Sequence, residues 1–251
     1  MMHRRRLLAA AAALAATAPA RAQAPAAGPR AEHVVLVHGA FADGSSYADV
    51  IPYLTRAGLK ATAVQNPLTS FADDVAATKR AFARQHGPVL LVGHSYGGVV
   101  ITEAGNDSRV KGLVYLAAIA PDVGESTSDL LGKYPPSPGL ARIKASEGFL
   151  TLDEQGFVED FAQDMPAERV HVLAAMQGPI SAGCFEAKPG AAAWRGKPSA
   201  YAVCTQDRLV PVALQRFLAE RMRATTVDLA SSHAPTLSQP EAVARMIIAA
   251  A

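Results

Sequence analysis

Residues 89–98 read Val-Leu-Leu-Val-Gly-His-Ser-Tyr-Gly-Gly, and this stretch decides the fold class. A short aliphatic run is typical of a buried strand. It leads directly into a G-x-S-x-G pattern, in which Gly93 and Gly97 leave room for a tight turn from strand to helix. Such a turn projects the Ser95 hydroxyl from the sheet edge at the positive end of the next helix. Ser95 is therefore a candidate nucleophile, and an ordinary glycine-rich turn is the alternative.

The rest of the chain alternates short apolar runs with helix-length amphipathic segments, which is typical of a parallel sheet covered on both faces. The expected strands are 34–37, 59–65, 89–93, 110–117, 199–205 and 225–229. The expected helices are 47–57, 71–86, 96–106, 212–222 and 240–249. The sequence therefore predicts an α/β fold with about six mostly parallel strands and helices on both faces.

The alternation stops in the middle of the chain, which divides it into a core of residues 31–120 and 199–251 and an insertion of residues 121–198. Loops of that length inside compact domains are rarely structureless. We expect a mostly helical cap over the carboxyl edge of the sheet, with one helix opened by a Thr151–Glu154 capping box and another near 166–177. The candidate pocket-wall residues of the cap are Leu130, Leu131, Phe149, Phe157, Phe161, Leu173 and Met176.

A serine hydroxyl needs a base to take its proton, and the base needs a carboxylate to orient it. In folds with this serine turn the chain order is serine, acid, histidine. His233 fits the base because it lies in a loop between the last strand and the last helix, whereas His171 lies within an expected cap helix. Asp207 follows the strand 199–205 and is the preferred acid, with Asp122 as the rival after the preceding strand.

Acyl transfer also needs hydrogen-bond donors for the oxyanion that develops on the substrate. The turn after the first strand can aim the amide of Ala40 at the pocket, and Tyr96, at the start of the helix after Ser95, offers a second amide. His38 and His94 are interpreted as structural residues that bond neighbouring loops.

Four motifs carry a resemblance to a known family: Val35–Ala40, Val92–Gly98, Asp207–Arg216 and Ser231–Ala234. The sequence resembles the α/β-hydrolase superfamily over nearly all of residues 31–251. Within it, the sequence is similar to the branch of plant methyl esterases and hydroxynitrile lyases and their bacterial esterase relatives. The resemblance implies a triad of Ser95, Asp207 and His233, an oxyanion hole at Ala40 and Tyr96, and hydrolysis of small carboxylic esters through an acyl-enzyme. It implies no metal and no cofactor.

Two departures from that branch narrow the expected chemistry. Hydroxynitrile lyases of this type need a threonine after the first-strand histidine and a lysine beside the catalytic histidine. This chain has Gly39 and Ala234 there, which argues against cyanohydrin cleavage. Ser95 also excludes the haloalkane dehalogenase reaction, which needs an aspartate. Amidase, thioesterase and small lipase activities share the expected residues and stay open, as does a ligand binder with an unused triad.

The first 22 residues are typical of a secretory signal peptide. A positive stretch at His3–Arg6 precedes the apolar run 7–18, and Ala20-Arg21-Ala22 fits a cleavage site before Gln23. The arginine pair also permits twin-arginine export. Residues 23–30 are expected to form a linker, and the protein is expected in the periplasm or outside the cell.

Charge and cysteine content set the expected partners. Of the 24 Lys and Arg residues four lie in the first 22 residues, and the remaining 20 face 22 Asp and Glu, which removes the argument for a nucleic-acid partner. No run after the leader has transmembrane length, so no stable membrane insertion is expected. The expected partner is the small ester that the resemblance implies. An oxidising compartment would permit a disulfide between Cys184 and Cys204, with two separate buried thiols as the alternative.

Overall fold

The computed structural model describes residues 31–251, and its centre is a six-stranded sheet with strand order β2-β1-β3-β4-β8-β9. Its strands are β1 (His33–Val37), β2 (Lys60–Ala63), β3 (Val89–His94), β4 (Val110–Leu116), β8 (Ser199–Cys204) and β9 (Thr225–Leu229). All five neighbouring pairs are parallel. The predicted α/β fold with six strands is confirmed.

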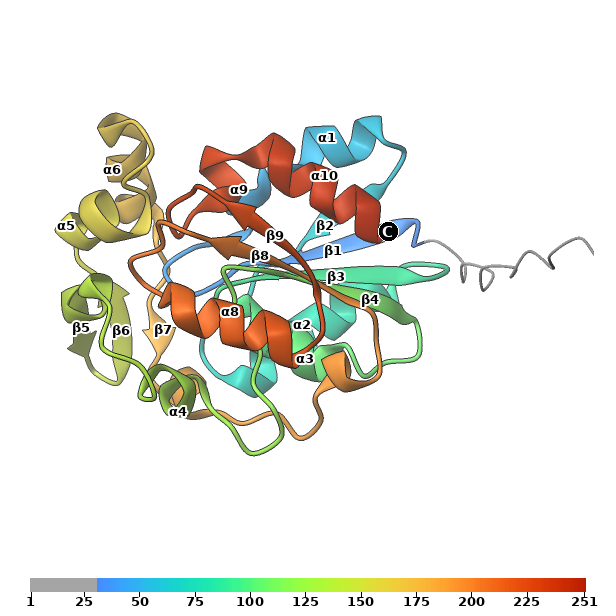
Figure 1. Cartoon of the computed structure of the whole chain (residues 1–251), viewed down its shortest axis with the longest axis horizontal. Helices are drawn as coiled ribbons and strands as arrows, with labels where there is room; N and C mark the ends of the chain where they lie inside the picture. Colours follow the sequence, from blue (N-terminus) through green and yellow to red (C-terminus); the bar gives the residue numbers. More distant parts are fainter. Residues whose placement is uncertain (1–30) are drawn as a thin grey trace, which may run out of the picture.

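Helices cover both faces of this sheet, as Figure 1 shows. The core helices are α1 (Ile51–Arg56), α2 (Phe71–Ala83), α3 (Gly97–Ala104), α8 (Val212–Arg221), α9 (Pro235–Ser238) and α10 (Pro240–Ala250), with the 3₁₀ turn η1 (Gly44–Tyr47). A further 3₁₀ turn, η4 (Ala193–Arg195), lies near the end of residues 121–198. Helices α1 and α10 pack on one face, and α2, α3 and α8 pack on the other. The central strands β1 and β3 are buried along their whole length, which explains their unbroken apolar sequences.

The predicted helix over 47–57 is wrong in its first half. The chain there forms the 3₁₀ turn η1 and then begins α1 at Ile51, with Pro52 in the first turn. Proline has no amide hydrogen and is tolerated only near a helix start, so it marks where the α-helix begins.

Residues 121–198 form most of the structure at the carboxyl ends of the strands, seen at the left of Figure 1. The elements of this cap are α4 (Thr127–Leu131), η2 (Pro138–Arg142), β5 (Ile143–Ser146), β6 (Phe149–Leu152), α5 (Glu154–Gly156), the π-helical turn η3 (Phe157–Phe161), α6 (Ala167–Met176), β7 (Ile180–Ser181) and α7 (Gly183–Glu186). Most of its regular residues are helical, as predicted. The three-stranded antiparallel sheet β5-β6-β7 was not predicted.

The hairpin β5-β6 also removes the predicted capping box. Its two-residue turn places Glu147 and Gly148 at φ 50° and 82°, and the pairing draws Thr151 into β6. The N-cap of α5 is Asp153 instead, whose carboxylate accepts the Gly156 amide at 2.7 Å. A strand hydrogen-bond ladder therefore outweighed the local capping signal.

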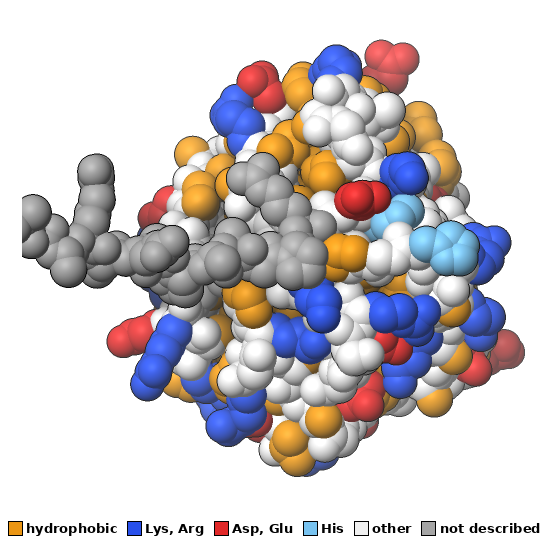
Figure 2. Space-filling model, turned by 90° about the vertical axis from the view of Figure 1, so that its right-hand side faces the viewer, with side chains coloured by type: hydrophobic (Ala, Val, Ile, Leu, Met, Phe, Trp, Pro, Cys, Tyr) orange, Lys and Arg blue, Asp and Glu red, His pale blue; other side chains and the backbone are white. Residues whose placement is uncertain are grey.

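The face opposite the cap carries mixed charge. In Figure 2 Lys and Arg side chains are spread among acidic, apolar and uncharged ones, with no single basic surface. Within residues 31–251, none of the helices has the length and hydrophobicity to span a bilayer.

The glycines around Ser95 allow β1, β3 and α3 to approach closely. A Cβ on Gly97 would collide with the carbonyl oxygens of Val37 and His38 at the end of β1, and a Cβ on Gly93 would lie 2.6 Å from the Gly97 carbonyl oxygen. These backbone atoms cannot move without shifting a central strand. The glycines are therefore required for packing as well as for the turn.

We expect Gly97→Ala to lower the free energy of unfolding by about 3 kcal/mol, because the new methyl group overpacks backbone against backbone. Gly196→Ala is the matched control, since a Cβ there meets no atom within 4 Å. We expect that control to change stability by less than about 1 kcal/mol. Urea unfolding monitored by circular dichroism measures both, and an equal effect of the two substitutions contradicts the packing argument.

Candidate active site

Ser95 lies in the turn between β3 and α3 with φ of 53°, in the left-handed region that non-glycine residues rarely adopt. Its amide donates to the Leu116 carbonyl at 3.1 Å, and its carbonyl accepts the amides of Gly98 and Ile119. Gly39 packs against it so closely that an added Cβ would lie 2.7 Å from the Ser95 Cβ. The strained turn is therefore held on three sides, and it aims the hydroxyl away from the sheet.

His233 connects Ser95 to Asp207. The Ser95 hydroxyl donates to His233 Nε2 at 2.9 Å, and His233 Nδ1 donates to Asp207 Oδ2 at 2.7 Å. The imidazole is 1% exposed. The structure therefore brings together the three predicted residues in an orientation that permits proton transfer from the serine hydroxyl.

The carboxylate of Asp207 accepts four hydrogen bonds. Oδ1 accepts the amides of Leu209 and Val210 at 2.8 and 2.9 Å, and Oδ2 accepts Gln215 Nε2 at 2.8 Å in addition to His233. These donors compensate a buried negative charge without any cation beside it. Gln215 is fully buried on α8 and was given no role from the sequence. The available signal was a polar side chain at a position that lies on the buried, otherwise apolar face of the amphipathic helix α8.

The rival acid, Asp122, lies elsewhere. Its two carboxylate oxygens pair with the guanidinium of Arg195, which holds the pKa of Asp122 below its usual range. The partner of His233 Nδ1 is Asp207. The geometry thus favours the predicted acid over its rival.

Tyr96 directly follows Ser95, and Ala40 directly follows Gly39, which packs against Ser95; both are buried. Neither backbone amide donates to an acceptor within the described chain, so both are free to bind an oxyanion. The Tyr96 side chain points inward, where its hydroxyl donates to Asp74 Oδ2 at 2.8 Å. Asp74 on α2 is fully buried, and its desolvation raises the pKa of its carboxyl. This anchor of Tyr96 was not predicted from the sequence.

His38 and His94 bond neighbouring loops, which fits their predicted structural role. His38 Nδ1 donates to the Gly39 carbonyl at 2.9 Å, and its Nε2 accepts the Asn66 amide at 3.0 Å. His94 Nε2 donates to the His233 carbonyl at 2.6 Å. Burial lowers the pKa of both imidazoles, that of His94 to about 3.

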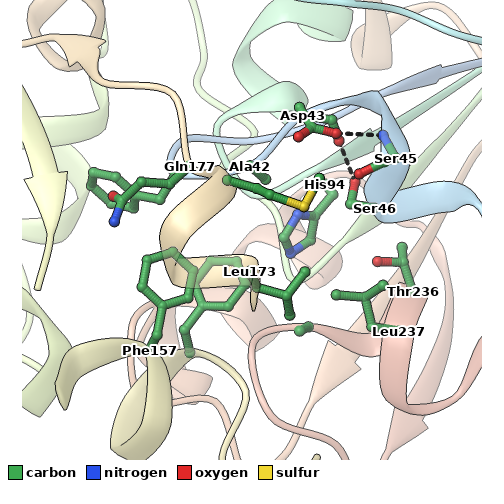
Figure 3. Close-up of a pocket in the computed structure, with 14 residues that line it drawn as sticks. Ala42, Asp43, Ser45, Ser46, His94, Phe157, Leu173, Gln177, Thr236 and Leu237 are labelled. Atoms are coloured by element: carbon green, nitrogen blue, oxygen red, sulfur yellow. Dashed lines mark hydrogen bonds between the residues drawn. The ribbon is translucent and has the colours of Figure 1, made fainter. Parts of the chain in front are cut away.

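A small, partly open hollow lies between the cap and the core beside this site. Figure 3 shows His94 between cap residues, such as Phe157 and Leu173, and core residues, such as Ser46 and Leu237. Of the predicted wall residues, four line it: Phe157, Phe161, Leu173 and Met176. Leu130, Leu131 and Phe149 do not, because Leu130 and Leu131 pack with the core and Phe149 is 37% exposed.

The disulfide between Cys184 and Cys204 is contradicted by the structure. Both are free, buried thiols, and they belong to different apolar clusters on opposite faces of the sheet. Burial raises the pKa of Cys184 to about 11 and that of Cys204 also above its usual value. The alternative of two separate core thiols is the one observed. Across residues 31–251, no group of three His, Cys, Asp or Glu side chains could hold a metal ion.

Comparison with known families gives a match between residues 34–246 and the Alpha/beta hydrolase family. The chain belongs to this family. An alpha/beta hydrolase of Aspergillus novofumigatus is 30% identical over 237 residues, covering 85% of this chain and 94% of the relative. A pyrethroid hydrolase of Sphingobium wenxiniae is 27% identical over 245 residues, covering 85% of each chain.

The solved structures confirm the α/β-hydrolase fold. A pyrethroid hydrolase from Sphingobium faniae superimposes with a TM-score of 0.74 at 23% identity, covering 87% of this chain and 96% of that one. Plant methylesterases and a plant α-hydroxynitrile lyase are also among the relatives, which confirms the predicted resemblance. The chain is thus an enzyme of the alpha/beta hydrolase class with esterase-type relatives.

The lowered pKa of His94 makes the stability of this hydrolase depend on pH. The unfolded chain takes up a proton at His94 below about pH 6.5, and the folded chain cannot take it up until about pH 3. The contribution of His94 to the free energy of unfolding is therefore fully present above pH 6.5. It decreases as the pH falls, by about 2 kcal/mol between pH 7 and 5.

When the pH falls from 7 to 5, we expect the free energy of unfolding of His94→Gln to fall by about 2 kcal/mol less than that of the wild type. This difference does not depend on how stable the variant is at pH 7. Urea unfolding at both pH values measures the difference. His86→Gln, at an exposed position, is the control and should keep the wild-type dependence. Parallel curves for the wild type and His94→Gln are the outcome that contradicts this account.

Proposed function

We propose that this hydrolase is a serine carboxylesterase that cleaves small carboxylic esters through an acyl-enzyme. The observation that carries the proposal is the hydrogen-bond chain from Ser95 Oγ through His233 to Asp207. The esterase-type relatives agree with it, because they include a pyrethroid hydrolase, a carbendazim hydrolyzing esterase and methylesterases.

In the proposed first half-reaction, Ser95 Oγ attacks the ester carbonyl carbon while His233 Nε2 takes the hydroxyl proton. His233 then gives that proton to the departing alkoxide, and the acyl group stays on Ser95. In the second half-reaction His233 takes a proton from water, the hydroxide displaces the acyl group, and the proton returns to Ser95. Asp207 stays ionised throughout and holds the imidazole in the required tautomer.

The negative charge on the carbonyl oxygen needs donors that are already in place. We propose the amides of Ala40 and Tyr96 for this task. Tyr96 follows Ser95, Ala40 follows Gly39, which packs on Ser95, and both amides lack an acceptor in the described part of the chain. One such donor contributes about 10²–10³ in rate. The Tyr96–Asp74 hydrogen bond supports the same proposal, since it fixes the residue whose amide is used.

The wall of the hollow beside the site disfavours anionic substrates. Apolar side chains form most of the wall, Asp43 is an acidic member of it, and none of the Lys and Arg residues within 31–251 lines it. A carboxylate on the substrate would lose its hydration there without gaining a cation. An ester with an apolar acyl or alcohol group therefore fits better than an anionic one.

We also propose that the protein is exported. The support is the leader sequence itself: a basic start, an apolar run and a cleavage pattern before Gln23. These residues and the linker 23–30 lie outside the described residues. The periplasm or the extracellular medium is the proposed location.

We expect Ser95→Ala and His233→Ala each to reduce kcat on a chromogenic short-chain ester by about six orders of magnitude, as in a serine protease. Asp207→Asn should cost about 10⁴, because the imidazole takes the wrong tautomer. Asp122→Asn is the matched control and should keep wild-type kcat. Retained activity in Asp207→Asn together with lost activity in Asp122→Asn would show that the acid is assigned wrongly.

We expect the full chain, expressed in a Gram-negative host, to appear in the periplasmic fraction with Gln23 as its first residue. A variant without residues 2–22 should stay in the cytoplasm. The double substitution of Arg5 and Arg6 by Lys distinguishes twin-arginine export from the general secretory route, because it should block only twin-arginine export. N-terminal sequencing of each fraction gives the answer, and an intact leader on an active cytoplasmic enzyme contradicts export.

A further inference from the structure

A five-residue segment of the cap, residues 160–164, contacts both loops that carry the proposed acid and base. The contacts are Asp160 Oδ1 with Arg208 Nε at 2.6 Å, Phe161 with the His233 ring at 5.3 Å between centroids, Gln163 Nε2 with the Gln206 carbonyl at 2.7 Å, and Asp164 Oδ2 with the Ser232 amide at 2.9 Å. The segment thus contacts Ser232, the residue before His233, and the residues directly before and after Asp207. Nothing in the sequence pattern indicated this arrangement.

The backbone of the loop that carries His233 is hydrogen-bonded to the cap at Ser232. The carbonyl of His233 accepts from His94, and the amide of Ala234 donates to the Ser232 hydroxyl, so these groups find partners within the core. The amide of Ser232 has its acceptor in the cap, at Asp164. Ser232 is fully buried, so without Asp164 its amide would have to find another partner away from bulk water.

The geometry of the π-helical turn η3 explains how this segment of the cap reaches the loops of Asp207 and His233. Its first two residues end the π-helical turn η3, which places the rings of Phe157 and Phe161 at 4.9 Å from each other. Phe161 then meets the His233 ring edge-on, at an interplanar angle of 77°. The helix ends at Ala162, and the next two side chains turn toward the loops at Gln206 and Ser232. π-helical turns are frequent at functional sites.

We propose that Asp164 is a positioning residue for His233: by accepting the Ser232 amide it fixes the loop that holds the imidazole against Ser95. The proposal rests on the proposed esterase function. Asp164 touches neither the substrate nor the reacting atoms, and it acts through the backbone one residue before the base. A displacement of about 1 Å between reacting groups can cost about 10²-fold in rate.

The experiment compares three variants of the mature enzyme on one chromogenic ester. Asp164→Ala removes the acceptor and should lower kcat about 10- to 100-fold while KM changes less than about twofold. Asp164→Asn keeps an oxygen that can accept the amide and should stay within about threefold of wild type. Glu159→Ala is the matched control, because Glu159 lies in η3 directly before the segment but bonds Arg142 and Gln155 and neither loop.

A second readout needs no turnover. The proton between His233 Nδ1 and Asp207 gives a downfield proton NMR signal, which should shift or broaden in Asp164→Ala and stay unchanged in Asp164→Asn and Glu159→Ala. If the wild type hydrolyses no ester, the proposed function fails while this signal still tests the loop. Because Asp164 is exposed, its truncation leaves no cavity. Should the melting temperature of Asp164→Ala still fall, Asp164→Glu displaces the same carboxylate by one methylene and tests the same contact.

Two outcomes overturn the proposal. In the first, Asp164→Ala keeps both the wild-type kcat and the wild-type signal, so the loop does not need the cap contact. In the second, Asp164→Asn loses as much kcat as Asp164→Ala, so the charge of Asp164 matters rather than its hydrogen bond.

Discussion

The left-handed backbone at Ser95 is the constraint on which the rest of the site depends. A serine at φ 53° costs conformational energy, of order 1–3 kcal/mol, and persists only where the surroundings fix it. Here the amide and carbonyl of Ser95 are bonded to β4 and to the segment after it, and Gly39 and Gly97 let β1 approach within contact distance. The packing of the sheet around Ser95 thus holds its backbone in the strained conformation that places the hydroxyl above the sheet edge.

The buried polar chain behind that hydroxyl follows from the same constraint. Once the Ser95 hydroxyl is raised, its proton acceptor must come from a loop at the same edge of the sheet. Asp207 and His233 lie in the loops that follow β8 and β9. A buried imidazole and carboxylate are costly without partners. The Leu209 and Val210 amides, Gln215 and the His94–His233 bond supply those partners, so the site is stable before any substrate arrives.

Local signals in the sequence were enough to predict the core and to name the three residues that the structure brings together. Buried parallel strands have continuous apolar runs, the serine turn needs glycines at fixed positions, and the chain order of the acid and base follows from the fold. The cap was predicted less well because its hairpin uses Glu147-Gly148, a weak turn signal, and because Thr151 also fits a helix start. The proposed disulfide failed because compartment and count say nothing about which face of the sheet a thiol occupies.

The contacts that could not be predicted are long-range ones between the cap and the core. Asp164 is 68 residues from Ser232 in sequence, and Gln163 is 43 residues from Gln206. The same cap contributes α6, which lines the hollow with Leu173 and Met176 and is tied to the core by the Arg169–Asp49 ion pair. That pair is exposed, and exposed ion pairs contribute little to stability. Val170, in contrast, is buried in the core and fixes α6 there, whereas Met176 is 49% exposed. The cap thus contributes to the site in two ways: α6 forms part of the wall of the hollow, and residues 160–164 contact the loops of Asp207 and His233.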